Sequence, residues 1–400
     1  MPEPAPPSVL DRVVVVGGGL AGTRAVQELR AQGHRGRVVL VGAERHRPYD
    51  RPPLSKDLLA GRTDDTTLDV DWDALDVDLR LGVRATGLRP GMLETDAGDL
   101  EHDGLVLAVG AEPRRLPGVD DAHVHLLRTV DDARRLRAEL RPGARVVVVG
   151  AGWVGAEVAT AAAAAGCRTT VVEAATAPLE GALGAEAGGH TVSWYAAAGV
   201  DLRLSSAVAA LGADGVTLAD GTILPADVVV VGIGARPSTD WLAGTGLLRT
   251  DGGSVAVDEH LAASPGVVAV GDCSAWRSRR FGTRLHVEHW DDALQAPAVA
   301  AATLLGRDAV HDPVPYFWSD QLGHVVQFTG YHRGADLVVE RGDPTGAEGW
   351  SLCWLREGRL VAVLAVDRPR DLLQGRRAVA AGASPDLDRL ADPAVPLKSA

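Results

Sequence analysis

The chain has 400 residues, of which 46% are hydrophobic and 23% charged, so it is long enough for two or three domains with their own cores. Its net charge of −13 makes a general attraction to nucleic acid or to an anionic membrane improbable. The three cysteines are widely spaced and form no Cys-x-x-Cys pair, which argues against a disulfide framework or a metal site. Without a signal-like N-terminus or a run of membrane-spanning length, we expect a cytoplasmic protein.

The first predicted element is a valine-rich strand at residues 13–16, whose lack of polar alternation predicts burial on both faces. A G-x-G-x-x-G pattern follows directly, formed by Gly17, Gly19 and Gly22. Residues 23–32 have helical periodicity, and a second strand at 37–41 leads to Glu44. Three glycines alone would only make a turn. The strand, the helix, the second strand and the acid together predict a dinucleotide site.

The same pattern occurs a second time after a predicted crossover. Residues 145–149 form a valine strand, followed by a second fingerprint at Gly150, Gly152 and Gly155. A helix at 156–165 and a strand at 169–172 lead to Glu173. Two complete fingerprints predict two bound dinucleotides. Because residues 174–189 contain no arginine, the acid favours a ribose with free hydroxyls and therefore NADH over NADPH.

A proline-rich segment at residues 47–56 is predicted to form a rigid loop after the first nucleotide unit. There Ser55 is predicted to cap a helix that starts near Lys56. Lysine occurs only at positions 56 and 398, so Lys56 stands out in a chain that otherwise uses arginine. A connector with surface charges is an equally good interpretation of this segment taken alone.

Further strands are predicted on either side of the second fingerprint. Residues 104–109 and 266–270 read as buried strands, and the second ends in a Gly-Asp pair that contains Asp272. A carboxylate at that point can lie beside a polyol. Residues 314–400 form a smaller region with a hairpin predicted at 350–366.

With these pieces in place, the sequence resembles the FAD-containing, NADH-dependent ferredoxin reductases, the group of putidaredoxin reductase and the reductase components of aromatic-ring dioxygenases. The resemblance covers essentially the whole chain. The matching segments are VVVVGGGLAG, RPYDRPPLSK, LVLAVGAEPR, VVVVGAGWVGAE, LPADVVVVGIGARP, VVAVGDC, YFWSDQ, LAVDRPRD and the tail VPLK. RPPLSK and FWSDQ are the specific ones, because the fingerprints alone would also fit flavoprotein disulfide reductases.

The resemblance implies an α/β fold with two Rossmann-like domains in a glutathione-reductase-like arrangement and a smaller C-terminal α+β domain. It places an FAD-binding domain at residues 1–115 and 245–313, an NAD-binding domain at 116–244, and the C-terminal domain at 314–400. The implied cofactor-binding residues are Gly17, Gly19, Ala21, Gly22, Glu44, Arg51, Lys56, Ala85, Arg128, Gly150, Gly152, Trp153, Gly155, Glu157, Glu173, Gly234, Asp272 and Trp290. Lys56, Glu157 and Trp318 are the implied catalytic residues, and no metal site is expected.

Several of these residues acquire specific roles from the resemblance. Glu44 would bind the FAD ribose, Arg128 would lie on the adenine side, and Asp272 would bind the ribitol chain. Ala21 would lie at the pyrophosphate turn and Glu173 would bind the NAD ribose.

The remaining roles concern the reacting rings. Lys56 would lie beside the isoalloxazine, where a cation can stabilise the reduced flavin. Trp153 would shield the flavin face until nicotinamide displaces it, and Trp290 and Trp318 would line the flavin pocket. Glu157 would lie near the nicotinamide amide and pair with Lys56. The alternatives are that Trp153 and Trp318 are core aromatic residues and that Glu157 is an exposed helix residue.

The activity implied is hydride transfer from NADH to FAD, followed by transfer of single electrons to a 2Fe-2S ferredoxin. That ferredoxin would serve an oxygenase, either a heme-thiolate monooxygenase or a Rieske dioxygenase. A cluster of four arginines is a candidate docking surface for the acidic ferredoxin, with a solvated loop as the alternative. The four are Arg277, Arg279, Arg280 and Arg284. The sequence departs from the family at residues 174–181, which lack the arginines that help to hold the nucleotide.

Two rival functions stay open. A disulfide or peroxide reductase on the same fold would need a reactive cysteine near the flavin, and residues 45–62 contain none. A redox-sensing flavoprotein that acts as a binding module would use the same nucleotide sites without turnover.

Overall fold

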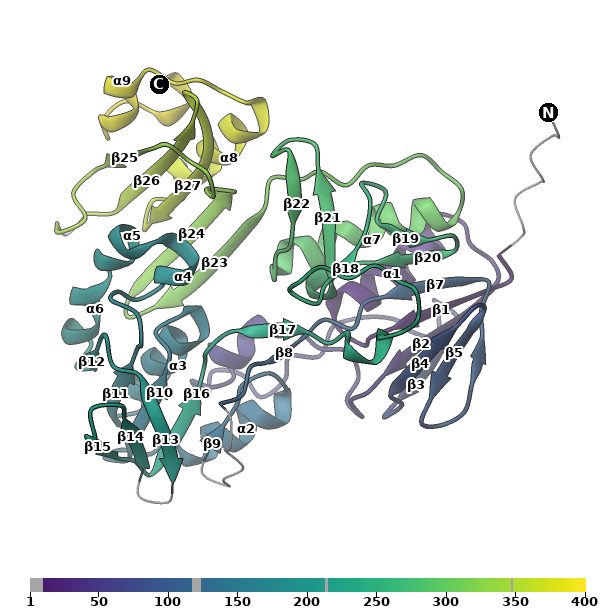
Figure 1. The fold of residues 1–400 in the computed structure, drawn as a ribbon, viewed down its shortest axis with the longest axis horizontal. Helices are drawn as coiled ribbons and strands as arrows, with labels where there is room; N and C mark the ends of the chain where they lie inside the picture. Colours follow the sequence, from purple (N-terminus) through teal and green to yellow (C-terminus); the bar gives the residue numbers. More distant parts are fainter. Residues whose placement is uncertain (1–9, 117–123, 213–214, 347) are drawn as a thin grey trace. The chain divides into compact units, whose positions relative to one another are not determined.

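The computed structural model describes residues 10–116, 124–212, 215–346 and 348–400 (Figure 1). The chain divides into two compact units. The first unit comprises Met1–Asp50, Thr67–Glu112 and Arg236–Pro313, and the second comprises Arg51–Thr66, Pro113–Ala235 and Val314–Ala400. The chain passes from one unit to the other within β8 (Ala111–Pro113) and β17 (Ala235–Pro237). The predicted division into three domains stays a prediction. In the described part of the chain, no helix is long and apolar enough to cross a membrane.

The first unit is built on a six-stranded sheet in the order β19-β20-β7-β1-β2-β3. Its strands are β1 (Arg12–Val16), β2 (Arg37–Gly42), β3 (Val77–Leu81), β7 (Gly104–Leu107), β19 (Ala262–Ser264) and β20 (Val267–Ala269). All pairings except that of β19 are parallel. The valines of β1 are at most 3% exposed, which confirms the predicted burial on both faces. Two helices, α1 (Leu20–Ala31) and α7 (Trp290–Leu304), pack on each other and on strands of this sheet (Figure 1).

Two small sheets complete the first unit. An antiparallel sheet contains β4 (Ala85–Arg89), β5 (Met92–Thr95) and β6 (Leu100–Glu101). The other contains β18 (Val255–Ala256), β21 (Ser274–Ser278) and β22 (Thr283–Leu285). A 3-10 turn, η3 (Gly271–Cys273), links β20 to β21.

The second unit repeats the arrangement with β10 (Arg145–Val149) at the centre of a parallel sheet in the order β12-β11-β10-β16-β9. The other strands are β9 (Val124–His125), β11 (Arg168–Val172), β12 (Asp201–Arg203) and β16 (Val228–Val231). The helix α3 (Trp153–Ala164) follows β10 and packs on β10 and β11. In both parallel sheets the fingerprint strand lies between strands on either side, so its carboxyl end is at the switch point where nucleotides bind.

The remaining elements of this part are short. The helices are α2 (Val130–Glu139), α4 (Glu180–Leu183), α5 (Ala185–Gly189) and α6 (Val192–Ala197). A three-stranded antiparallel sheet consists of β13 (Val208–Gly212), β14 (Gly215–Leu218) and β15 (Ile223–Pro225). α2 begins at a capping box between Thr129 and Asp132, which satisfies backbone N–H groups of its first turn.

The C-terminal part of the second unit is an antiparallel sheet in the order β23-β24-β27-β26-β25, followed by two helices (Figure 1). The strands are β23 (Tyr316–Gln321), β24 (His324–Gly330), β25 (Leu337–Arg341), β26 (Trp350–Arg356) and β27 (Arg359–Val366). The helices are α8 (Pro369–Ala381) and α9 (Leu387–Ala391). β26 and β27 form the predicted hairpin. The predicted fold class, two Rossmann-like halves and a C-terminal α+β domain, is confirmed.

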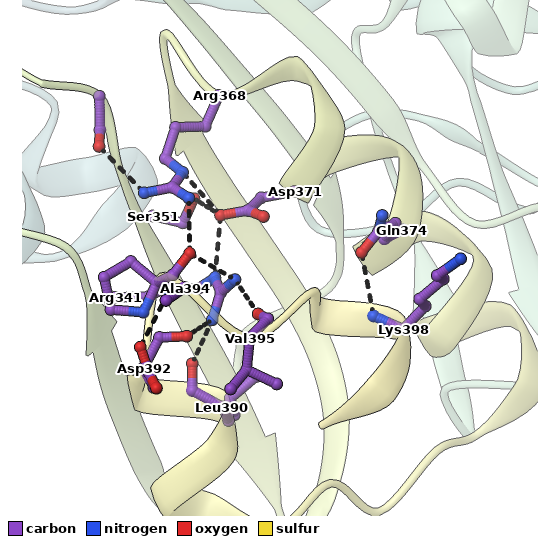
Figure 2. Close-up of polar contacts among 12 residues, drawn as sticks. Arg341, Ser351, Arg368, Asp371, Gln374, Leu390, Asp392, Ala394, Val395 and Lys398 are labelled. Carbon is purple, nitrogen blue, oxygen red and sulfur yellow. Dashed lines mark hydrogen bonds and ion pairs between the residues drawn. The ribbon is translucent and has the colours of Figure 1, made fainter.

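A buried arginine binds the C-terminal segment of the chain to this sheet through hydrogen bonds (Figure 2). Arg341 of β25 is 1% exposed, and its Nε lies 2.9 Å from Asp371 Oδ2. Its other guanidinium nitrogens donate to the carbonyls of Leu390 at 3.0 Å, Asp392 at 2.5 Å and Val395 at 2.5 Å. A buried cation needs a counter-ion and filled donor positions, and both are present here. The guanidinium therefore holds residues 390–395 against the C-terminal sheet.

Candidate active site

The outer glycines of the first fingerprint are required by the backbone itself. Gly17 has a φ of +119°, and a Cβ placed on it would lie 2.1 Å from the carbonyl oxygen of Ala108. A Cβ on Gly22 would lie 1.9 Å from the carbonyl oxygen of Gly17. The first glycine therefore allows the tight turn and the third allows α1 to pack close to β1.

The second fingerprint has the same construction in the second unit. Gly150 has a φ of +104°, and a Cβ on it would lie 2.4 Å from the carbonyl oxygen of Gly232. A Cβ on Gly155 would lie 2.0 Å from the carbonyl oxygen of Gly150. Gly234, at a φ of +96°, follows β16 at the same end of the sheet.

The middle glycines are different, because nothing in the described chain requires them. Gly19 has a φ of −91° and Gly152 a φ of −79°, which any residue can adopt. A Cβ on either would meet no described protein atom within 4 Å. Each glycine precedes the first turn of a helix, where free backbone N–H groups attract a phosphate. The open space beside both fits a pyrophosphate, so the residues present fit two dinucleotides.

Two segments that lead to acidic residues lie beside the first loop within its own unit. A Cβ on Gly18 would lie 3.5 Å from the Cα of Gly42, two residues before Glu44. Glu44 follows β2, and its Oε2 accepts a hydrogen bond of 2.5 Å from the hydroxyl of Tyr49. A Cβ on Gly271 would lie 3.1 Å from the Cβ of Ala21, so the segment before Asp272 rests on the first turn of α1. The structure thus places the residue before the predicted Asp272 against Ala21 at the fingerprint end of the sheet.

Other residues predicted for FAD are distributed over both units. Trp290 begins α7, and its Nε1 donates to Asp50 Oδ1 at 2.8 Å in the first unit. Ala85 begins β4 of the small antiparallel sheet. In the second unit, Arg51 donates to the carbonyl oxygen of Arg128 at 2.6 Å. These contacts hold the side chains in place, while their predicted roles toward FAD stay predictions.

Glu173 ties the second loop to the strand that follows it. Its Oε2 accepts from the backbone N–H of Ala151 at 2.7 Å, and its Oε1 accepts from that of Ala175 at 2.9 Å. Ala151 lies between the first two glycines of the fingerprint. A carboxylate offers about four acceptor positions, so two further donors such as ribose hydroxyls can bind to it.

A buried polar network in the second unit is centred on Glu157 of α3. Its side chain is 5% exposed, and its Oε1 lies 2.6 Å from Lys56 Nζ and accepts a second hydrogen bond of 2.6 Å from Ser319 Oγ. Its Oε2 accepts from Ser55 Oγ at 2.5 Å. A buried carboxylate is stable only when it is paired in this way. The expected pairing of Lys56 with Glu157 is therefore present, and the two motifs RPPLSK and FWSDQ both supply donors.

The predicted role of Ser55 as a helix cap was wrong. In the described chain no α-helix begins near Lys56; a 3-10 turn, η1 (Pro52–Ser55), precedes that residue. The hydroxyl of Ser55 donates to Glu157, 102 residues further along the chain, in place of a cap. Ser319 was missed as a site residue, although it lies within the FWSDQ motif.

The two tryptophans predicted near the flavin have different surroundings. Trp153 makes an edge contact with Phe317 at a ring distance of 4.6 Å. Trp318 stacks on Tyr316 at 6.2 Å. Because side chains alternate along a strand, Trp318 and Ser319 point to opposite faces of β23. Trp318 therefore lies on the face away from Glu157.

The cysteines are unsuited to thiol chemistry. All three are unpaired, and Cys273 and Cys353 are buried. Burial raises the pKa of the Cys273 thiol to about 12 and that of the Cys353 thiol to about 12. Burial also raises the pKa of Cys167. A thiol must ionise to attack a disulfide or peroxide, and these stay protonated at neutral pH. Among the described residues no cluster of His, Cys, Asp or Glu could hold a metal ion.

The predicted arginine cluster is partly neutralised. Arg279 forms an ion pair with Glu259, and the backbone N–H of Arg280 donates to Asp312 Oδ2 at 2.8 Å. Arg284 donates to two backbone carbonyls at 2.5 and 2.6 Å, opposite Arg277 in the β21–β22 pair. The surface therefore carries less positive charge than four arginines suggest.

Comparisons with known proteins cover the whole architecture. Residues 11–296 match the family described as pyridine nucleotide-disulphide oxidoreductase, and residues 316–400 match the reductase C-terminal family. The chain is 37% identical to the anthranilate 1,2-dioxygenase system ferredoxin–NAD(+) reductase component of Burkholderia cepacia, over 97% of this chain and 99% of that protein.

Two solved structures are also similar. The crystal structure of Fdr9 is 50% identical, with a TM-score of 0.92, and the match covers 97% of this chain and 99% of that one. The reductase of the covalent putidaredoxin reductase–putidaredoxin complex is 32% identical, with a TM-score of 0.92 and 97% of each chain covered. These matches confirm the predicted resemblance.

Proposed function

The chain belongs to the pyridine nucleotide-disulphide oxidoreductase family, and from this premise we propose that it is an FAD-dependent NADH:ferredoxin reductase. Proteins of this family use FAD and NAD(H), so the predicted enzyme class and cofactors are confirmed. The observation that carries the proposal is the presence in one chain of two fingerprint loops, each with an open middle glycine and a following glutamate. The similar reductase solved with putidaredoxin supports an iron–sulfur protein as the electron acceptor.

The two loops take different nucleotides in this proposal. The first loop would hold FAD, with Glu44 at the ribose and Asp272 at the ribitol chain. The second loop would hold NADH, with Glu173 at the ribose and Glu157 near the nicotinamide amide. Support for this assignment comes from the contact of Ala21 with the segment before Asp272 in one unit and from the polar network of Glu157 in the other.

Bound FAD supplies the capacity to accept a hydride from NADH and to release the electrons one at a time to a 2Fe-2S ferredoxin that serves an oxygenase. The protein contributes position and charge. Lys56 is 13% exposed and its ammonium is held by Glu157, so a positive charge stays at a fixed point without a full hydration shell. A fixed cation in a partly desolvated site stabilises nearby developing negative charge more than a mobile one does. Trp153 would cover the flavin face, and Trp318 would line the flavin pocket.

Nucleotide selectivity would come from Glu173. Its remaining acceptor positions suit the 2′-hydroxyl of NADH, while its negative charge repels a 2′-phosphate. The loop that follows adds a second carboxylate, because Glu180 accepts from the backbone N–H groups of Thr176 and Ala177. In relatives with arginines in this loop the charge would be opposite. We therefore expect NADH to be strongly preferred over NADPH.

The acceptor is a one-electron carrier and not a disulfide. The buried, protonated thiols argue against a thiol cycle, which would need a thiolate close to the flavin. A binding module without turnover would not need the buried Lys56–Glu157 pair. We also propose a cytoplasmic location, because the three unpaired cysteines suit a reducing compartment.

An anaerobic titration of the yellow holoprotein tests the proposal. NADH should bleach the flavin rapidly and NADPH far more slowly, and a 2Fe-2S ferredoxin should then be reduced with return of the flavin colour. Glutathione disulfide and hydrogen peroxide are the comparison acceptors. Faster reoxidation by either of these than by any ferredoxin would contradict the proposal.

The ferredoxin is proposed to dock on the β21–β22 surface, where Arg277, Arg279, Arg280 and Arg284 lie. Opposite local charge steers association even between proteins of like net charge. Because Arg279 is paired with Glu259 and the guanidinium of Arg284 is held by two backbone carbonyls, Arg277 is the most informative position. Its substitution to glutamate should raise the KM for ferredoxin and leave ferricyanide reduction unchanged. A wild-type KM for ferredoxin at every salt concentration would show that docking occurs elsewhere.

A further inference from the structure

We propose that Ser319 is a positioning residue for Glu157, through which the C-terminal sheet completes the nicotinamide side of the site. The inference rests on the proposed function and adds a residue that is not among the predicted site residues. It assigns the C-terminal sheet, defined as β23 to β27, a part in hydride transfer as well as in the fold.

The contact itself is short and buried. Ser319 is 1% exposed, and its hydroxyl donates to Glu157 Oε1 at 2.6 Å. Lys56 donates to the same oxygen, while Ser55 donates to the other one. Hydrogen bonds to an ionised carboxylate are stronger than neutral ones, and water cannot readily replace a donor at a buried position. Each of the two serine hydroxyls therefore fixes the position of one carboxylate oxygen.

The contact is part of a longer match between α3 and β23. Trp153 contacts Phe317, Glu157 contacts Ser319, and the hydroxyl of Thr160 accepts from the backbone N–H of Leu322 at 2.8 Å. On α3 these residues are spaced i, i+4 and i+7, which puts them on one helix face. Between the first two contacts, four helical residues rise about 6 Å and two strand residues about 6.6 Å, so these two contacts match in spacing. The third contact lies just past the end of β23, where the chain turns.

This match explains why Glu157 depends on the sheet for its orientation. Without the Ser319 hydroxyl, Oε1 would keep only Lys56, whose flexible stem can follow the carboxylate. With Ser55 still bound to Oε2, the pair could then pivot about that contact and leave the position at which a nicotinamide amide would be met. A loss of this kind slows hydride transfer more than it weakens NADH binding, since the binding of the adenosine half is untouched.

The experiment compares four holoenzyme variants in anaerobic stopped flow with NADH. Ser319→Ala should lower the limiting rate of flavin reduction at least about tenfold, the effect of losing one preorganised donor. Ser319→Thr keeps the hydroxyl and should restore the rate to within about threefold. Ser319→Cys keeps the volume but donates weakly, so it should be slow like the alanine variant. Ser351→Ala is the matched control, because Ser351 is also buried in the same sheet and donates to Asp371 at 3.2 Å.

Melting temperature and the transfer of electrons from dithionite-reduced enzyme to ferredoxin are measured on the same samples. Electron transfer to ferredoxin should stay at the wild-type rate in the Ser319 variants, since it does not involve the nicotinamide. The melting temperature of Ser319→Ala should fall about as far as that of Ser351→Ala, which also loses one buried hydrogen bond. If the alanine variant does not fold, the comparison of cysteine with threonine provides the same test. Wild-type reduction rates in Ser319→Ala, or equal losses in threonine, alanine and Ser351→Ala, would overturn the inference. Failure of NADH to reduce the wild-type flavin would instead overturn the proposed function.

Discussion

The two glycine loops have nearly identical backbones, yet the helices that follow them carry different chemistry. In each loop the first glycine donates to the end of the next strand, Gly17 to Val41 and Gly150 to Val172, both at 2.8 Å. The outer glycines are required for packing and the middle glycines face open space in both. The repeated part of the design is therefore the part that would hold a pyrophosphate.

The difference appears at the fifth residue of each helix. In α1 this is Arg24, whose guanidinium binds Gln27 and Glu28 of its own helix. In α3 it is Glu157, whose carboxylate accepts hydrogen bonds from Ser55 of η1, from Lys56 and from Ser319 of β23. One helix thus only supports a loop, while the other carries a group held by three donors from two segments that are distant in sequence. The comparison teaches that a fingerprint identifies a nucleotide site but that the chemistry depends on what reaches the following helix.

The largest expected effect is a loss of stability when the third glycine of either loop is replaced, because both loops depend on its close packing. Gly22→Ala and Gly155→Ala would each place a methyl group about 2 Å from a backbone oxygen, so we expect each to destabilise its unit by about 3 kcal/mol or more. Thermal unfolding of the holoprotein measures this. Gly189→Ala is the control, because a Cβ there meets no described atom within 4 Å. Unfolding temperatures equal to that of the control would show that the close packing of helix and strand is misjudged.

The next largest effect is expected at Lys56, which binds the glutamate that distinguishes α3 from α1. Lys56→Ala should retain the fold but slow flavin reduction by NADH about a hundredfold, because the fixed cation is lost. Lys398→Ala, at the only other lysine and exposed, should reduce the flavin at the wild-type rate. Stopped-flow traces of the two variants decide the matter. Unchanged kinetics in Lys56→Ala would remove this residue from the mechanism.

A smaller effect is expected at the end of the second loop. Glu173→Gln removes the charge but keeps one oxygen, so kcat/KM with NADH should fall about tenfold, as for the loss of one charge-assisted hydrogen bond. The preference over NADPH should narrow at the same time, since the repulsion of a 2′-phosphate is relieved. Steady-state assays with both nucleotides measure the ratio. An unchanged ratio would mean that selectivity is set by another residue.

Much of this architecture was predictable because its signals are local. Four consecutive valines, a glycine pattern and a helical period follow one another within a short stretch, and both Rossmann halves were found from them. The hairpin of β26 and β27 also followed from short patterns. Local sequence specifies these elements because each is stabilised by contacts between near neighbours and by burial of its own face.

The site was less predictable because its contacts are distant in sequence. Glu157 is joined to Ser55 across 102 residues and to Ser319 across 162, and a serine in a strand has no pattern that reveals its partner. Local reasoning assigned Ser55 to a helix cap for the same reason. Arg341 is similar, since a charged residue at a strand end usually faces water, yet here the C-terminal backbone surrounds it (Figure 2).

The most direct test of the two-nucleotide arrangement is the pair of middle-glycine variants, Gly19→Ala and Gly152→Ala. Neither methyl group would meet a described protein atom, so both holoproteins should fold normally. We predict that Gly19→Ala binds FAD at least about tenfold more weakly with little change in the KM for NADH, and that Gly152→Ala shows the reverse, because each methyl would intrude only on its own pyrophosphate. Loss of FAD in both variants, or of FAD in Gly152→Ala alone, would contradict the assignment of one nucleotide to each loop.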